Sequence, residues 1–188
     1  YAKQDAEKLS GKGDTSQKLT LMKTSADSLK KSADALNDSS LWEKKKIKKK
    51  DEKTGEEIEV EDYDWDKITK AVKSFVEDYN DVVKEAGESN TKDVLRNASW
   101  MTGMTDKNSN MRAKIGITIG KGNKLELDED ALKQADISSL KTVFTGYNSF
   151  VSKISQKATG ISNAANRASA TYTNNGTYSK TDASLTSS

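Results

Sequence analysis

Apolar residues spaced alternately three and four apart occur in three separate parts of this 188-residue chain, and this spacing restricts its fold most strongly. The first run, in residues 14–37, contains Leu19, Met22, Ala26, Leu29, Ala33 and Leu36. Such steps place the apolar residues on one face of an α-helix, at the a and d positions of a heptad repeat. We therefore expect this helix to pack against another helix.

Two later stretches repeat the pattern. The second run, in residues 65–86, contains Ile68, Val72, Phe75, Tyr79, Val82 and Ala86. Asp64 is placed to cap this helix and Gly87 to end it. The third run contains Phe144, Tyr147, Val151, Ile154, Ala158, Ile161, Ala165 and Ala168. Because a glycine inside a helix costs about 1 kcal/mol relative to alanine, we expect Gly146 to end a short helix and Asn148 to cap the long one.

The three runs predict a mainly α protein, an elongated three-helix bundle packed through heptad faces, with two short β-hairpins. Only 33 % of the residues are hydrophobic and 32 % are charged, which suits narrow apolar faces better than a thick interior. The residues expected to pack within or between subunits, called here the heptad-face residues, are Leu19, Met22, Leu29, Leu36, Ile68, Val72, Phe75, Tyr79, Phe144, Val151, Ile154 and Ile161.

The pattern also divides the chain. Residues 14–172 are expected to form a single helical domain that includes both hairpins. Residues 1–13 are expected to be loose, and residues 173–188, rich in small polar side chains without periodicity, are expected to be a polar tail.

A charged segment between the first two runs predicts a β-hairpin over residues 43–63, called here the charged hairpin. Six lysines surround Ile47, the following strand is acidic, and Lys53-Thr54-Gly55 is typical of a turn. A loop at residues 52–55 sets Ile47 opposite Val60. The same register pairs Lys46 with Glu61, Lys48 with Glu59, and Lys50 with Glu57.

Two interpretations of the charged hairpin are open. Cross-strand pairs of opposite charge contribute roughly 0.2 to 1 kcal/mol each, so the pairs set the register without a ligand. In the alternative interpretation, residues 44–50 form an interaction module whose Lys46, Lys48 and Lys50 bind an acidic protein or polymer.

Residues 114–128 predict the second hairpin rather than a phosphate-binding loop. A P-loop requires G-x-x-x-x-G-K-[ST], but the spacing from Gly116 to Lys121 is one residue too short, and Gly122 stands where a hydroxyl belongs. The alternating residues 124–128 indicate a returning strand instead of a helix. The acids at 128–130 are interpreted as caps of the helix that follows.

The chain contains no Cys and no His, so thiolate and imidazole chemistry and the usual zinc ligands are excluded. A calcium loop starting at Asp106 fails because Met111 stands where glycine is needed and Ile117 where glutamate is needed. A carboxylate hydrolase would require two acids converging in a cleft, and the pattern indicates none. We therefore expect no catalytic residues, no cofactor and no metal site.

Charge and hydropathy also limit the partners. The formal net charge is +2, which provides little attraction to nucleic acid. No apolar run approaches the length of about 20 residues that a helix needs to cross a bilayer, so no membrane insertion is expected. The absence of cysteine allows a cell-surface and a cytosolic protein equally.

Two segments resemble flagellar filament cap proteins, also called hook-associated protein 2. The stretch AVKSFVEDYNDVV, residues 71–83, is similar to the helix that this family carries as FV-x-x-YN. The stretch AKIGITIGKGNKLELDEDALKQA, followed by VFTG at 143–146, is similar to a later Ile-Gly-Ile strand, turn, strand, helix and Phe-Thr-Gly. The likeness covers about residues 66–160. Upstream, the family has large β-rich head domains, whereas this chain has a heptad helix and the charged hairpin.

The resemblance implies a non-enzymatic structural component of an extracellular bacterial appendage. Such a protein is secreted, lies at the flagellum or cell surface and acts by assembly. Its implied partners are other appendage subunits or copies of itself, which makes a homo-oligomer an expectation. No catalytic residues transfer from this family, since it has none.

Overall fold

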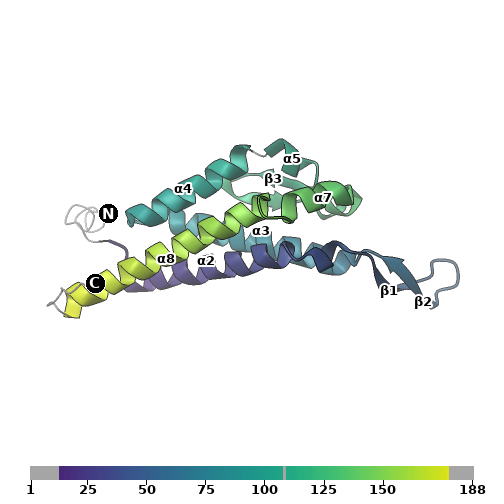
Figure 1. The fold of residues 1–188 in the computed structure, drawn as a ribbon, viewed down its shortest axis with the longest axis horizontal. Coiled ribbons are helices and arrows are strands. Elements are labelled where there is room, and N and C mark those ends of the chain that lie inside the picture. Colours follow the sequence, from purple (N-terminus) through teal and green to yellow (C-terminus); the bar gives the residue numbers. More distant parts are fainter. Residues whose placement is uncertain (1–12, 108, 178–188) are drawn as a thin grey trace.

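The computed structural model describes residues 13–107 and 109–177, and this part of the chain is mainly helical with two small antiparallel β-hairpins, as predicted (Figure 1). Its four longest helices are α2 (Ser16–Leu36), α3 (Trp65–Gly87), α4 (Lys92–Lys107) and α8 (Phe150–Thr177). The short helical elements are η1 (Ser39–Trp42), α5 (Ser109–Ala113), η2 (Lys121–Asn123), α6 (Glu129–Gln134) and α7 (Ile137–Phe144). The strands are β1 (Lys45–Lys50), β2 (Glu57–Asp62), β3 (Ile117–Ile119) and β4 (Leu125–Leu127).

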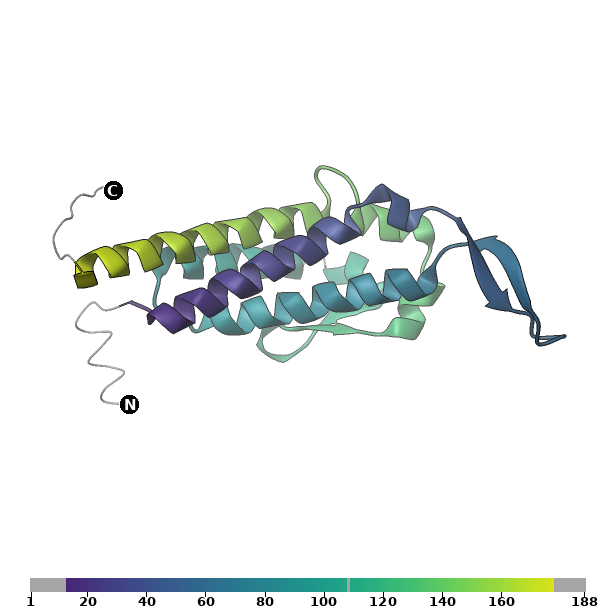
Figure 2. The ribbon, with the colours of Figure 1, turned by 90° about the horizontal axis from the view of Figure 1, so that it is seen from below.

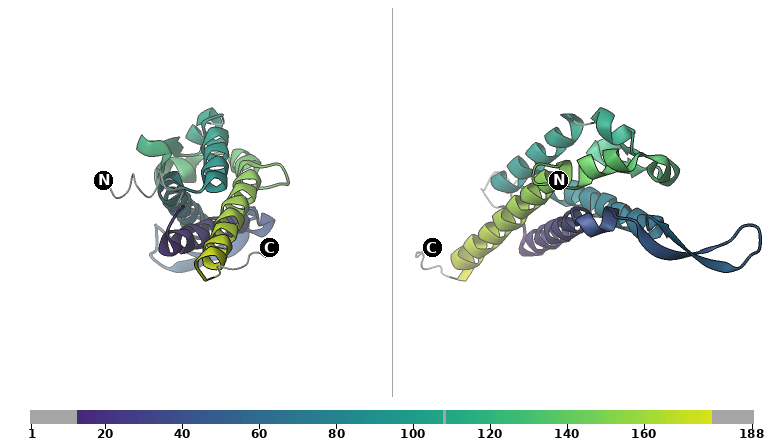
Figure 3. Two further views of the ribbon diagram at one scale, coloured as in Figure 1. Left: turned by 90° about the vertical axis from the view of Figure 1, so that its left-hand side faces the viewer. Right: turned by 45° about the vertical axis from the view of Figure 1, so that its right-hand side comes forward.

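The long helices lie along one another to form an elongated body. Helix α2 contacts both α8 and α3, while α4 covers α8 from the other side (Figures 1 and 2). Seen end-on in Figure 3, the four helices surround a common interior. The second hairpin and α5 to α7 fill the end of the body next to α3.

The expected three rods of similar length are not what the structure shows, because α4 is a fourth packed helix. It has 16 residues, against 21, 23 and 28 for α2, α3 and α8. Its buried residues are Val94, Ala98, Met101 and Thr105, again in steps of four and three. The sequence pattern was missed because the small Ala98 and the polar Thr105 weaken the apolar face, while Leu95 and Trp100 are exposed.

Two expectations about the last long helix are wrong. Ser149, not Asn148, caps α8, because the Ser149 Oγ accepts a hydrogen bond from the Ser152 N–H at 3.2 Å. Tyr147, a member of the third apolar run, is 88 % exposed and so does not pack in the core. Phe144 ends the short helix α7 just before Gly146, as expected.

The boundary of the polar tail is also too early, since α8 continues to Thr177. Once a helix has formed, each added residue gains a hydrogen bond, so it can extend beyond its apolar face. The rest of the expected tail, and all but one residue of the expected loose segment 1–13, lie outside the described residues.

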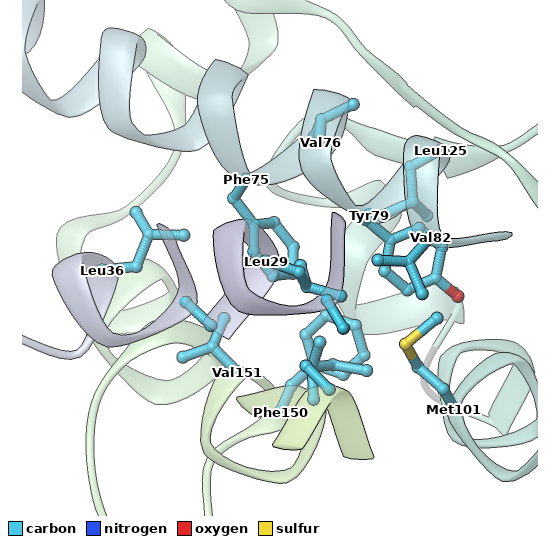
Figure 4. Close-up of a cluster of buried hydrophobic side chains, with 14 of the residues drawn as sticks. Leu29, Leu36, Phe75, Val76, Tyr79, Val82, Met101, Leu125, Phe150 and Val151 are labelled. Atoms are coloured by element: carbon cyan, nitrogen blue, oxygen red, sulfur yellow. The ribbon is translucent and has the colours of Figure 1, made fainter. Parts of the chain in front are cut away.

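The core is one continuous apolar cluster, part of which Figure 4 shows. In that view Leu29 of α2 points toward Phe75 of α3, and Phe150 of α8 lies below them. Trp42 closes one end of the core. Its ring stacks on that of Phe144, with 5.4 Å between the ring centres, and its Nε1–H donates a hydrogen bond to the Leu36 carbonyl at 2.7 Å.

The second hairpin has the predicted turn. Gly122 and Asn123 adopt φ values of 67° and 63° there, a region that glycine and asparagine tolerate. Gly116 has a φ of 91°, and an added Cβ would lie 2.6 Å from the Asp128 carbonyl oxygen, so only glycine fits. The Asp128 carboxylate accepts from the Ala131 N–H at 3.1 Å and caps α6, as expected.

Candidate functional site

The structure buries all twelve heptad-face residues inside the single chain. Their exposed fractions range from 0 to 2 %, and they lie in one cluster. These residues therefore hold the bundle together and are not accessible to a partner of the folded chain. A candidate interaction surface has to be sought on the outside.

The charged hairpin is the most conspicuous external feature, since β1 and β2 extend beyond the end of the bundle (Figures 1 and 3). Its register is the predicted one, with Ile47 opposite Val60 and Lys48 opposite Glu59. Opposed residues of an antiparallel pair share a face, and successive residues alternate between faces. The register therefore fixes what each face presents.

One face of this hairpin carries charges only. Called here the charged face, it consists of Lys46, Lys48, Lys50, Glu57, Glu59 and Glu61, all exposed. The three lysines form a row along β1, and the three glutamates form a parallel row along β2. Lys48 and Glu57 lie 3.8 Å apart with side chains 72 % and 69 % exposed, so this pair contributes at most about 1 kcal/mol.

The opposite face is partly apolar. Ile47 and Val60 are half-buried there, and Ile58 is 40 % exposed. The Nζ of Lys49 donates to Asp62 at 2.6 Å across this face. That hydrogen bond, with a second from the Tyr63 N–H, holds the pKa of Asp62 below its usual value.

The α2–α8 interface contains a repeated polar contact that the sequence reasoning missed. The Ser162 Oγ donates to Asp27 at 2.6 Å, and the Ser155 Oγ donates to Asp34 at 2.8 Å. Lys23 and Lys30 each donate to the aspartate four residues later. Both sets repeat after seven residues, and the repeated K-x-S-A-D-x-L at 23–29 and 30–36 was the available signal.

These contacts favour the ionised form of Asp27. Burial alone raises the pKa of Asp27, but the hydrogen bonds from Lys23 and Ser162 outweigh it, so the pKa lies below its usual value. The polar repeat therefore fixes the register of two antiparallel helices whose apolar residues are mostly small or aliphatic.

Asp14 was likewise missed. Its buried carboxylate accepts from the Ser89 Oγ at 2.6 Å, the Asn90 N–H at 2.7 Å, and both the N–H and Oγ1 of Thr91 at 3.1 and 2.6 Å. Thr91 directly precedes α4, so the start of α2 caps a helix about 75 residues further along the chain. No local sequence signal could have shown this.

Tyr79 and Arg112 are the buried ionisable groups of the interior near α4 and α5. The Tyr79 hydroxyl lies 2.7 Å from the Thr105 hydroxyl. The Arg112 guanidinium lies 4.7 Å from the centre of the Phe150 ring, and its nitrogens have no hydrogen-bond partner among the described residues. Burial lowers the pKa of Arg112, while Tyr79 and Asp106 nearby oppose that change.

Replacing Arg112 with methionine is expected to stabilise the fold by about 1 to 2 kcal/mol, because a buried charge without hydrogen bonds is costly and methionine keeps the contact with an aromatic ring. Urea unfolding followed by circular dichroism measures the change. The matched control, Lys114→Met, removes an exposed cation two residues away and should leave the stability within about 0.5 kcal/mol. A clear loss of stability in Arg112→Met would contradict this account.

Alkaline pH is expected to destabilise the protein through Tyr79. Burial raises its pKa to about 12 from 10.0, although the Thr105 hydrogen bond opposes this. The unfolded chain ionises first, so this stabilisation is complete below pH 10 and is lost as the pH rises toward 12. The loss should reach about 2 kcal/mol in urea unfolding.

The Tyr79→Phe variant should lose this pH-dependent step. Tyr147→Phe, which alters an exposed ring, should retain it. Equal pH dependence in Tyr79→Phe and the parent would show that another group is responsible.

The part of the chain that the structure describes contains no group of three or more acidic residues that could hold a metal ion. No helix within it is long and apolar enough to cross a bilayer. The stretch rejected as a calcium loop runs through the end of α4 and through α5.

Comparisons of the chain with protein-family models, with curated proteins and with solved structures find no match. The resemblance to flagellar cap proteins therefore rests on the quoted motifs alone, and the charged hairpin stands as the candidate interaction surface on its geometry.

Proposed function

We propose that this chain is a non-enzymatic structural component of an extracellular bacterial appendage, resembling a flagellar filament cap or hook-associated protein. It acts by assembly, with other appendage subunits or with copies of itself. In this role the bundle is a stiff body and the charged hairpin is the arm through which it contacts a neighbour.

The observation that carries the proposal is the position of the charged hairpin at the end of the elongated bundle (Figure 1). Strands β1 and β2 form a two-stranded sheet, so each keeps one edge that no described strand covers. Free strand edges are places where another chain can add, and charged side chains on an edge keep away chains whose charges do not complement them. A projecting arm with two such edges suits a subunit that assembles.

The ordered motifs in residues 71–83, 113–135 and 143–146 favour the appendage context. They map onto α3, the second hairpin, α6 and α7, and both β4 and α6 contact α3. Most of the likeness thus falls on elements that pack against one another, which is the arrangement a shared module would have.

The alternative function is an interaction module that uses Lys46, Lys48 and Lys50 to bind an acidic protein or polymer. The register argues against it, since each of these lysines lies opposite a glutamate. An anionic polymer would meet a glutamate row beside the lysine row and would gain little net attraction. Salt-sensitive binding to polyglutamate that is lost on changing these lysines to Gln would revive this alternative.

Immunogold electron microscopy on cells that express the natural gene tests the proposal. An antibody against the chain is expected to label surface appendages, and deletion of the gene should shorten or remove them. Complementation with the full chain should restore them, whereas Ile154→Asp, which disrupts the buried core, should not. Label confined to the cell interior, or unchanged appendages after deletion, would overturn the proposal.

A further inference from the structure

We propose that copies of this chain associate head to tail through the charged hairpin, with the β1 edge of one copy pairing with the β2 edge of the next. The inference deepens the proposed function, on which it rests, by naming the partner as a second copy of this chain. It is argued from the charges of the two strands, the direction of their backbone groups and the twist of sheets.

The charges select which edges can meet. Strand β1 carries five lysines and no acid, and β2 carries four acids and no lysine. Residues directly opposite each other across strands repel when their charges are alike and attract when they are opposite. Pairing β1 with its own copy, or β2 with its own copy, therefore places like charges together at every position of the charged face.

The choice of edges also decides the symmetry of the assembly. A twofold interface joins a patch to the same patch of the partner, so a twofold edge pairing would be β1 with β1 or β2 with β2. Both are repelled. The attractive pairing, β1 with β2, is head to tail, and such an interface leaves one free edge on each side for a further copy, which leads to rings or filaments.

The backbone geometry makes the same residues available for pairing. The Asp51 N–H bonds to the Glu56 carbonyl at 2.7 Å, inside the hairpin. Antiparallel pairs alternate between hydrogen-bonded and non-hydrogen-bonded positions, so the N–H groups of Lys48 and Glu59, three positions further along, point away from the partner strand. The other residues of the charged face occupy the same non-hydrogen-bonded positions, so their N–H groups also point away from the partner strand. A neighbouring copy that adds to this edge thus pairs a lysine with a glutamate.

The twist of sheets turns the bundles of successive copies away from each other. Adjacent strands of a sheet rotate by roughly 20 to 25°, so successive two-stranded hairpins rotate by about 40 to 50° relative to each other. Because each bundle continues from the base of its hairpin, each bundle points in a direction rotated by the same angle from that of the preceding copy. The partly apolar faces, with the 40 % exposed Ile58, then lie side by side along the stack.

Blocking one edge at a time tests the pairing. Lys48→Pro removes an outward N–H from β1, and Glu59→Pro removes one from β2, and proline is tolerated at such edge positions. The matched controls Lys48→Gln and Glu59→Gln remove the same charges but keep the N–H groups. Circular dichroism melts should match the parent for all four variants, because the hairpin lies outside the buried core.

Sedimentation velocity on the full chain gives the readout. The parent should form species larger than the 20.6 kDa monomer as concentration rises, with the dissociation constant increasing about tenfold between about 0.1 M and 1 M salt. Each proline variant alone should be monomeric. An equimolar mixture of the two should form a one-to-one dimer and nothing larger, since each supplies the edge that the other lacks. The glutamine controls should still form species larger than a dimer.

Each other outcome overturns the inference. A proline variant that dimerises alone indicates a twofold interface, and a parent that stays monomeric at every concentration removes the self-association. Hydrogen exchange on the unmodified chain provides a check without mutation: the outward N–H groups of the charged face should gain protection with concentration, and constant exchange there would contradict the pairing. Appendage labelling in cells is independent of these results, so the proposed function can stand if this inference fails.

Discussion

Changing Ile154 to aspartate is expected to unfold the bundle at ordinary temperature. Ile154 is fully buried on α8, where that helix packs against α2. A carboxylate placed there loses its hydration without gaining a partner, and the resulting cost exceeds about 4 kcal/mol. Since domains of this size are stable by only about 5 to 15 kcal/mol, much of the folding free energy is lost. Thermal melts by circular dichroism measure this directly.

Two matched variants separate burial from charge. Gln156→Asp adds the same side chain at an exposed position of the same helix and should change the stability by no more than about 1 kcal/mol. Ile154→Val removes one methyl group from the core and should cost about 0.5 to 1.5 kcal/mol. If Ile154→Asp melted like the parent, the assignment of this face to the core would be wrong.

Removing the Asp14 carboxylate is expected to cost about 3 kcal/mol, the second largest effect. In Asp14→Ala the donors of Ser89, Asn90 and Thr91 lose their common acceptor; among the described residues only the Thr91 N–H keeps another, the Ser89 Oγ at 2.9 Å. The start of α4 then loses its cap, and the contact that ties it to the start of α2 is gone. Urea unfolding measures the loss.

The controls for Asp14 test whether position rather than charge matters. Asp66→Ala removes an exposed acid from the first turn of α3 and should cost no more than about 1 kcal/mol. Asp14→Asn keeps an acceptor oxygen but loses the charge, so its stability should fall between the parent and the alanine variant. Equal losses in Asp14→Ala and Asp66→Ala would refute the capping role.

The charged hairpin shows how far local pattern can go. Its register, with Ile47 opposite Val60, was predicted from the turn residues and the alternating charges, and the structure has the same pairs. Two-residue periodicity and a short loop are properties of neighbouring residues, so they are readable without a fold. The caps Asp64 and Asp128 were predicted for the same reason, since each bonds to an N–H three residues later.

The fourth helix shows where such reading stops. The buried face of α4 has the heptad spacing, but Ala98 and Thr105 on it are not large apolar residues, and Trp100 on the outside is. Its burial is decided by α8, which α4 covers, and by the Tyr79 hydroxyl that bonds to Thr105. Those partners lie far away in the chain, so the periodicity of α4 alone could not identify its inner face.

The sequence by itself determined that the three strong runs are helical, which face of each is apolar, where the two hairpins lie, and how the charged hairpin pairs. These follow from backbone periods of 3.6 and 2 residues, which act over a few neighbours. Only the tertiary structure decided that the heptad faces close on one another within a single chain, that Asp14 caps α4, and that no described strand covers the outer edges of the charged hairpin. Those outcomes depend on which surfaces fit together when the chain folds. Residues 75 or more positions apart, such as Asp14 and Ser89, can form such a contact without any pattern in the residues near either of them.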